Sequence, residues 1–290
     1  MKNITKVILC VFSPFRAGVL VLFFSCNKEE PIPSYIHIDT INLTTNYAVQ
    51  GSISNKILDA WIYVDDQQIG AFEMPCTVPV LYEGEHTIKI RAGIKENGIA
   101  DTRIYYPFYE IFTQTVTLTR GQIITLNPTI TYSSFADFTW LEDFTSATPS
   151  ICDTINSDTV MKQTTTPSEV FEGTGSGVVA LGSGTNGYIG VSCNKYDSLK
   201  GKTVFLEMNY NCNTEFKVGI VGYTSSNTID VQWPALTLNP TSGWNKVYVN
   251  LTNSIAVGTN SVKFGIFFSM AKDANLSTSY FYLDNVKLVN

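Results

Sequence analysis

The stretch TVFLEMNYNC at 203–212 decides the fold, because apolar and polar residues alternate along it. The even-numbered positions from Val204 to Cys212 are large and apolar, whereas Glu207 and Asn209 lie between them. Successive side chains of a β-strand point to opposite faces, so a period of two predicts a strand with one buried face. The stretch VKFGIFFSM at 262–270 shows the same alternation.

Similar strand-like runs continue along the chain and are separated by Gly, Ser and Asn rather than by helical patterns. In the N-terminal half, His86, Ile88 and Ile90 alternate with Thr87 and Lys89. Short strands joined by turns, without helices between them, are typical of antiparallel sandwiches. The sequence therefore predicts an all-β fold.

The length of the chain predicts more than one folding unit. Its 290 residues exceed the roughly 100 to 200 residues of an ordinary domain. The strand pattern loosens around 131–134, where a boundary is expected. We therefore expect two antiparallel β-sandwich domains, a small one at 36–131 and a larger one at 135–290.

The N-terminus has the layout of a secretory signal, in which Lys2 and Lys6 precede an apolar stretch at 7–24. The uninterrupted part of that stretch, 17–24, is far shorter than the roughly 20 apolar residues that span a bilayer. A retained transmembrane helix is therefore the weaker interpretation. We expect 1–25 to be a signal peptide that is removed before Cys26, and 26–35 to be an extended tether.

The FFSC motif at 23–26 resembles the lipobox of bacterial lipoproteins. That resemblance implies that Cys26 carries lipid and anchors the chain to a membrane. The KEE motif at 28–30 is similar to the short acidic signals that send lipoproteins of the Bacteroidota to the cell surface, which implies an outer-membrane location. An ordinary signal peptide with an incidental cysteine is the alternative, and the choice between periplasmic and surface orientation stays open.

The charge of the exported chain argues against nucleic acid as a partner. Removing Lys2, Lys6 and Arg16 with the leader leaves 16 basic residues against 25 acidic ones, a formal charge of −9. Phosphate binding needs clustered Lys and Arg, and the sequence has no such cluster.

Four cysteines remain after Cys26, and their spacing shows no close pair of the kind that zinc sites use. An exported protein can form disulfides, but the sequence leaves the pairing open. The four are Cys76, Cys152, Cys193 and Cys212.

The first predicted domain contains a recognisable order of motifs. WIYVDD at 61–66 is followed by Gly70, Pro75 and then GEH at 84–86, which leads into a strand. This order resembles the small β-sandwich modules of the PEGA type. The resemblance implies a scaffolding role for this domain rather than a catalytic one.

The second predicted domain carries four motifs that resemble the jelly-roll, galactose-binding-like modules found among carbohydrate-binding modules. The motifs are WLEDF at 140–144, GTGSGVVAL at 173–181, GWNKVYVNL at 243–251 and YFYLDNV at 280–286. The resemblance implies a jelly roll, and it does not identify a ligand.

Many such jelly rolls hold a structural calcium ion where the first and last strands meet. The resemblance therefore implies calcium ligands among Glu142, Asp143, Glu172 and Asp284, since calcium prefers several oxygen ligands. The alternative is that Asp284 makes a polar turn and Asp143 caps a strand end.

A glycan site needs an exposed aromatic ring for the apolar face of a sugar and polar groups for its hydroxyls. Trp233, Tyr223, Tyr188 and Asn186 are the candidates, although aromatic residues also dominate the cores of β-sandwiches. Catalytic motifs such as the Gly-x-Ser-x-Gly elbow or His-Glu-x-x-His do not occur in the sequence.

The leading hypothesis is a non-catalytic, lipid-anchored outer-membrane protein whose C-terminal jelly roll binds extracellular glycan. An envelope assembly or adhesion scaffold that binds an outer-membrane protein partner is the alternative. A third hypothesis is an accessory of a larger enzyme complex. The sequence leaves the identity of the ligand and the oligomeric state open.

Overall fold

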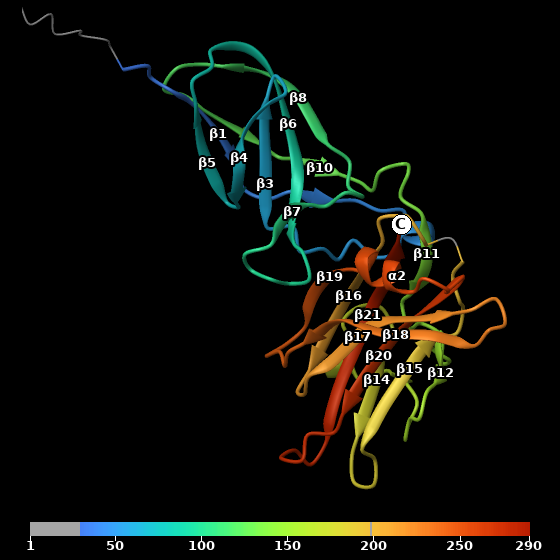
Figure 1. The fold of residues 1–290 in the computed structure, drawn as a ribbon. Helices are drawn as coiled ribbons and strands as arrows, with labels where there is room; N and C mark the ends of the chain where they lie inside the picture. Colours follow the sequence, from blue (N-terminus) through green and yellow to red (C-terminus); the bar gives the residue numbers. More distant parts are fainter. Residues whose placement is uncertain (1–29, 198) are drawn as a thin grey trace, which may run out of the picture. The chain divides into compact units, whose positions relative to one another are not determined.

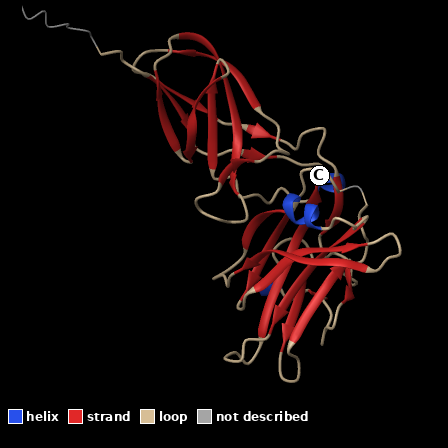
Figure 2. Ribbon diagram, viewed as in Figure 1, coloured by secondary structure: helices blue, strands red, loops and turns tan. Residues whose placement is uncertain are grey.

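The computed structural model describes residues 30–197 and 199–290, and these consist almost entirely of strands and loops (Figure 2). Pro33–Asn290 forms one compact unit. Cys26, the signal peptide and most of the tether lie outside the described residues. Within the described ranges, helices are too short or too polar to cross a membrane.

The N-terminal strands form three sheets (Figure 1). Their bounds are β1 Ser34–Ile38, β2 Asn42–Leu43, β3 Asp59–Val64, β4 Gln67–Glu73, β5 Cys76–Val80, β6 Gly84–Lys95, β7 Arg103–Tyr105, β8 Phe112–Leu118, β9 Ile123–Leu126 and β10 Thr129–Ile130, with helix α1 at Tyr47–Gln50. One sheet has the order β4-β3-β6-β7, with β8 also pairing β6, and the others are β5-β1-β9 and β10-β2. The pairings are antiparallel except for β1 with β9 and β2 with β10.

The C-terminal strands form two antiparallel sheets that face each other as a sandwich. Their bounds are β11 Phe138–Glu142, β12 Ile151–Thr154, β13 Lys162–Thr164, β14 Ser176–Leu181, β15 Gly187–Ser192, β16 Phe205–Cys212, β17 Phe216–Tyr223, β18 Ile229–Leu238, β19 Asn245–Asn250, β20 Lys263–Ala271 and β21 Ser279–Val289, with the 3-10 turn Pro167–Glu169 and helix α2 at Thr252–Val257. One sheet runs β13-β14-β21-β16-β19, with β11 also pairing β21, and the other runs β12-β15-β20-β17-β18. The prediction of an all-β, antiparallel sandwich fold is confirmed.

The alternating residues of β16 place one face of this strand in the core of the C-terminal sandwich. Leu206 and Met208 point inward and are fully buried. Between the two sheets, the ring of Phe281 in β21 stacks on that of Phe216 in β17, with the ring centroids 4.5 Å apart. Burying such side chains stabilises the fold by roughly 1.5 to 3 kcal/mol each.

The opposite face of β16 is also buried, because N-terminal residues cover it. Glu207 is 0% exposed, and its carboxylate accepts hydrogen bonds of 2.8 Å from the hydroxyls of Tyr106 and Tyr132. Lys246 Nζ lies 3.3 Å from Glu207 Oε2, and Lys287 Nζ donates to the Tyr132 hydroxyl at 3.2 Å. We call these five residues the junction cluster. It joins strands from both halves of the chain.

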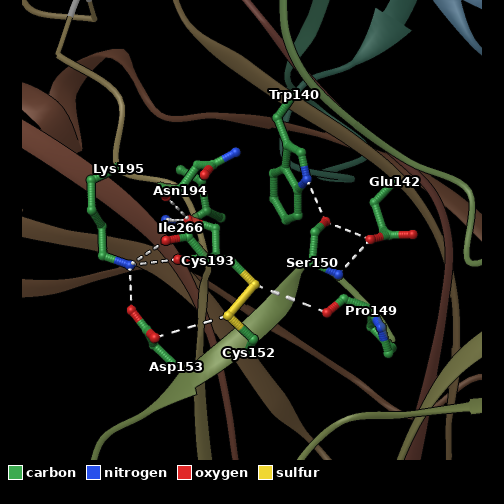
Figure 3. Close-up of a disulfide and its surroundings, with 11 residues drawn as sticks. Trp140, Glu142, Pro149, Ser150, Cys152, Asp153, Cys193, Asn194, Lys195 and Ile266 are labelled. Carbon is green, nitrogen blue, oxygen red and sulfur yellow. Dashed lines mark hydrogen bonds and ion pairs between the residues drawn. A yellow bond between two sulfur atoms is a disulfide. The ribbon is translucent and has the colours of Figure 1, made fainter. Parts of the chain in front are cut away.

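One disulfide is present among the described cysteines. Cys152 in β12 pairs with Cys193, which directly follows β15 (Figure 3). Cys76 and Cys212 are free. The pairing that the sequence left open thus connects an edge strand to its neighbour in the β12-β15-β20-β17-β18 sheet.

Candidate functional site

The sheet β12-β15-β20-β17-β18 has one side turned away from the main core, and we call it the outer sheet face. Directly opposite residues on paired strands point to the same side of a sheet. The register therefore aligns one row across four strands. It consists of Ile189, Ser269, Lys217 and Thr237. Lys217 and Thr237 are exposed, while Ile189 and Ser269 are partly exposed.

A second row gives this face an apolar floor. Val191, Phe267 and Gly219 lie opposite one another, and Val191 and Phe267 form a small cluster with Val221 that is separate from the main core. A Cβ atom at Gly219 would lie 2.7 Å from the Phe267 ring and closer still to the carbonyl oxygen of Trp233. Glycine at 219 is therefore required for the close approach of the ring and the edge strand.

One end of the outer sheet face is formed by an aromatic ring and an ion pair. Lys195 Nζ lies 5.4 Å from the centroid of the Tyr223 ring and 2.8 Å from Asp153 Oδ2. The Cys152–Cys193 disulfide joins the two segments that carry Asp153 and Lys195 (Figure 3). Partial burial, followed by the charge of Asp153, raises the pKa of Tyr223 above its ordinary value, so its ring stays neutral.

The other end of the outer sheet face opens into a hollow of about 730 Å³. Ile189, Lys217 and Ser269 from the first row line it, together with Glu215 and Asn213. From the hollow to the Tyr223 end, the face follows the nine residues of β20. At roughly 3.4 Å for each step from one residue to the next, the first and last of these residues lie about 27 Å apart. An extended ligand of several sugar rings fits this length.

The structure separates the residues predicted to bind glycan. Tyr223 lies on the outer sheet face with Val221 and Phe267. Trp233 is 46% exposed, but it stands opposite Ile220, whose side chain points into the core, so it lies on the other side of the sheet.

Tyr188 and Asn186 flank Gly187 and have different environments. Tyr188 is 1% exposed and packs against Phe281, so its ring cannot cover a sugar. The prediction of Tyr188 as a glycan-binding residue is corrected: it is a core residue, because it stands opposite inward-pointing Met270. Asn186 is exposed next to the hollow, and its backbone N–H donates to Asp158 Oδ2 at 2.7 Å.

Two of the residues predicted to bind calcium are engaged in local hydrogen bonds. Glu142 accepts from the backbone N–H groups of Phe144 (2.7 Å) and Ser150 (2.6 Å) and from the Ser150 hydroxyl. Asp143 accepts from the hydroxyls of Thr145 (2.7 Å) and Tyr47 (3.2 Å). Both carboxylates therefore stabilise the loop after β11.

The other two predicted calcium ligands lie beside the junction cluster. Asp284 accepts from the Ser176 hydroxyl at 2.6 Å, and Glu172 accepts from the Asn285 amide at 2.9 Å. Burial lowers the pKa of Lys246, and the charges of Glu207 and then of Glu172 and Asp284 oppose that shift by favouring the ammonium form. Among the described residues, no group of three or more His, Cys, Asp or Glu side chains gathers as metal ligands. Backbone, hydroxyl and amide donors of the chain itself already bind the four carboxylates, and calcium binding by them stays a prediction.

Sequence reasoning missed most of the outer sheet face. Lys217, Ser269 and Phe267 lie on strands that pair only in the folded chain, and no local motif marks them. Lys195 and Asp153 are brought together by a disulfide whose pairing the sequence left open. The alternation within each strand was the only available signal.

This chain is similar to known proteins in its structure, and the comparisons of its sequence found no match. No family model matches the sequence, and no curated protein matches it. A carbohydrate-binding module described in a study of promiscuous specificity in the β-sandwich superfamily is 14% identical, with a TM-score of 0.39, covering 80% of this chain and 85% of that chain. The xylan-binding domain of family 22 is 14% identical, with a TM-score of 0.38, covering 52% and 93%. A point variant of a family 29 carbohydrate-binding module, complexed with mannohexaose, is 11% identical, with a TM-score of 0.35, covering 53% and 92%. At these identities and TM-scores, the ligands of those proteins do not identify the ligand of this chain.

Proposed function

We propose that this protein is a non-catalytic glycan-binding protein and that the outer sheet face binds an extended polysaccharide. The observation that carries the proposal is the combination, on one face, of the partly exposed Tyr223 ring and a row of polar side chains, Lys217, Ser269 and Thr237. Val191 and Phe267 are 0% and 2% exposed, so they support the face from beneath rather than contact a ligand.

The chemistry of this face suits a sugar chain. A pyranose ring has an apolar face, which the Tyr223 ring can cover, and a rim of hydroxyls that amides, hydroxyls and charged groups can bind. Lys217 offers an exposed donor, and Glu215 at the hollow offers an acceptor. The face therefore offers an aromatic contact at its Tyr223 end and polar contacts along the first row.

The proposal includes a lipid anchor at Cys26 in the outer membrane, facing the cell surface. Its support is the FFSC motif at 23–26 and the acidic motif that follows, both in the sequence. Tethering by a short segment such as 26–35 would hold a glycan-binding sandwich close to the membrane. Incorporation of radiolabelled palmitate into the wild type but not into Cys26→Ala tests this part independently of glycan binding.

Affinity gel electrophoresis against a panel of neutral and acidic polysaccharides tests the glycan site. We expect retention by at least one polysaccharide, and a loss of affinity of roughly two- to tenfold in Tyr223→Ala, because an aromatic contact contributes about 0.5 to 1.5 kcal/mol. Trp233→Ala is the matched control, since it removes an exposed aromatic ring from the other side of the same sheet.

Two outcomes contradict the proposal: no polysaccharide in the panel retards the wild type, or Tyr223→Ala and Lys217→Ala together leave retention unchanged. Capture of an outer-membrane protein in place of any glycan would instead favour the scaffold hypothesis.

A further inference from the structure

A second cavity, of about 320 Å³, shares only Thr237 and Pro240 with the hollow on the outer sheet face. The loop between β6 and β7 forms one wall, because Glu96 makes an isolated bridge with Tyr248 in β19 and Asn97 N–H donates to the Tyr248 carbonyl at 2.9 Å. The segment around Lys56 and the connection between β18 and β19 form the other walls. We call this space the lysine cavity.

The charged residues that line the lysine cavity are Lys56, Lys95 and Lys246, with no Asp or Glu among its described lining residues. This is unusual in a chain with more acidic than basic residues. Burial and then the neighbouring charge of Lys95 lower the pKa of Lys56 below its ordinary value. Two ammonium groups thus repel each other at this wall, and a bound anion would relieve that repulsion.

Lys246 supplies a buried cation at the inner side of this cavity. Its side chain is 3% exposed, and within the described residues its Nζ has no hydrogen-bond partner. Glu207 lies 3.3 Å away in the junction cluster and partly balances its charge. Because this buried ammonium group is already paired with Glu207, it adds positive charge behind the cavity rather than a free contact for a ligand.

The neutral lining of the lysine cavity matches a sugar rather than a bare ion. The Asn245 amide accepts from Lys56 Nζ and donates to the Tyr210 hydroxyl at 3.1 Å. Asn239 and Thr241 add further polar groups. Because the cavity offers amides and hydroxyls as well as lysines, it can bind both the hydroxyls and the carboxylate of one sugar.

We propose that the lysine cavity binds an acidic sugar residue, with the carboxylate of a uronic acid placed between Lys56 and Lys95. The assignment of a sugar rests on the proposed glycan-binding function, whereas the preference for an anion rests on the lysines alone. The cavity would select glycans that carry carboxylates. The outer sheet face would bind the polysaccharide whether or not its sugars carry carboxylates.

Titration of the full-length mature protein with glucuronate, followed by the NMR signals of the lysine side chains, tests this site. We expect glucuronate, but not glucose, to shift the Lys56 and Lys95 signals and to raise the pKa of Lys56. Loss of both lysines in Lys56→Met/Lys95→Met should weaken glucuronate binding about tenfold or more, because charge-assisted contacts are lost. Lys162→Met, at an exposed lysine in β13, is the matched control and should bind like the wild type.

The proposal is overturned if glucuronate shifts neither lysine, if the double variant binds as the wild type does, or if glucose binds equally well. Equal binding of inorganic sulfate would overturn the assignment of an acidic sugar. Because both lysines are at least partly exposed, the double variant should fold, and its melting temperature checks this. Glucuronate binding that persists in Tyr223→Ala would leave this inference standing even if the outer sheet face binds no glycan.

Discussion

Replacing Glu207 by Gln should destabilise the protein more than the same replacement at an exposed glutamate. Glu207 is completely buried, accepts hydrogen bonds from Tyr106 and Tyr132, and lies 3.3 Å from Lys246. Burial lowers the pKa of Lys287 to about 8, and the charge of Glu207 opposes this shift; Lys287 also donates to the Tyr132 hydroxyl. The variant keeps the shape of the side chain but leaves two buried ammonium groups without this counterion.

The size of the effect follows from that loss of charge. Removing one partner of a buried ion pair costs about 3 to 5 kcal/mol. In domains of this size each kcal/mol lowers the melting temperature by about 2 to 4 °C, so the variant should melt roughly 6 to 20 °C lower. Tyr132→Phe removes the hydrogen bonds that its hydroxyl donates to Glu207 and the one that it accepts from Lys287, and it should cost about 1.5 to 3 kcal/mol.

Differential scanning calorimetry and urea unfolding measure both variants against Glu85→Gln, which changes an exposed carboxylate in β6. Since the junction cluster joins residues from both halves of the chain, Glu207→Gln should lower the whole transition. The reasoning is refuted if Glu207→Gln is as stable as Glu85→Gln. It is also refuted if the variant lowers one of two separate transitions and leaves the other unchanged.

Three further predictions concern the disulfide, a buried acid and calcium. Replacing Cys152 and Cys193 by Ser should lower the free energy of unfolding by about 4 kcal/mol, because the bridge closes a loop with a sequence separation of 41; an unchanged urea midpoint would contradict this. Burial raises the pKa of Asp284 from 3.8 to about 6. The Asp284 carboxyl group therefore binds its proton more tightly in the folded state than in the unfolded state. Its contribution to the free energy of unfolding is fully present below about pH 4 and is lost as the pH rises through about 6. Asp284→Asn should gain roughly 3 kcal/mol relative to the wild type between pH 4 and pH 7, and parallel pH profiles of unfolding would disprove the assignment. Adding calcium or EDTA should leave the melting temperature unchanged, since the predicted ligands are satisfied by other groups; stabilisation by calcium that Asp284→Asn abolishes would restore the calcium hypothesis.

Sequence alternation was sufficient to predict the fold class, because each strand can be recognised from its own residues. Leu206 and Met208 are in the core, as the period of two in β16 predicts. The same pattern predicts a polar, wet face for Glu207, yet that residue is completely buried. A local pattern shows which residues share a face, but it cannot show that another part of the chain covers that face.

The candidate site was much harder to predict. The row through Ser269 and Lys217 exists only because β20 pairs with β17, and strand order cannot be obtained from periodicity. Tyr188 and Tyr223 are both strand tyrosines in the sequence, and only the register shows that one points inward and the other outward. Glu142 and Asp284 matched a motif, but their hydrogen-bond donors come from separate segments, Ser150 before β12 and Ser176 at the start of β14.

A crystal structure of the protein with the oligosaccharide that affinity gels retain best would test the central claim most directly. The account predicts a sugar chain lying along the outer sheet face, with one ring against Tyr223 and another within reach of Lys217 Nζ. A sugar chain bound on the Trp233 side of the sheet, or only at the N-terminal sheets, would contradict it.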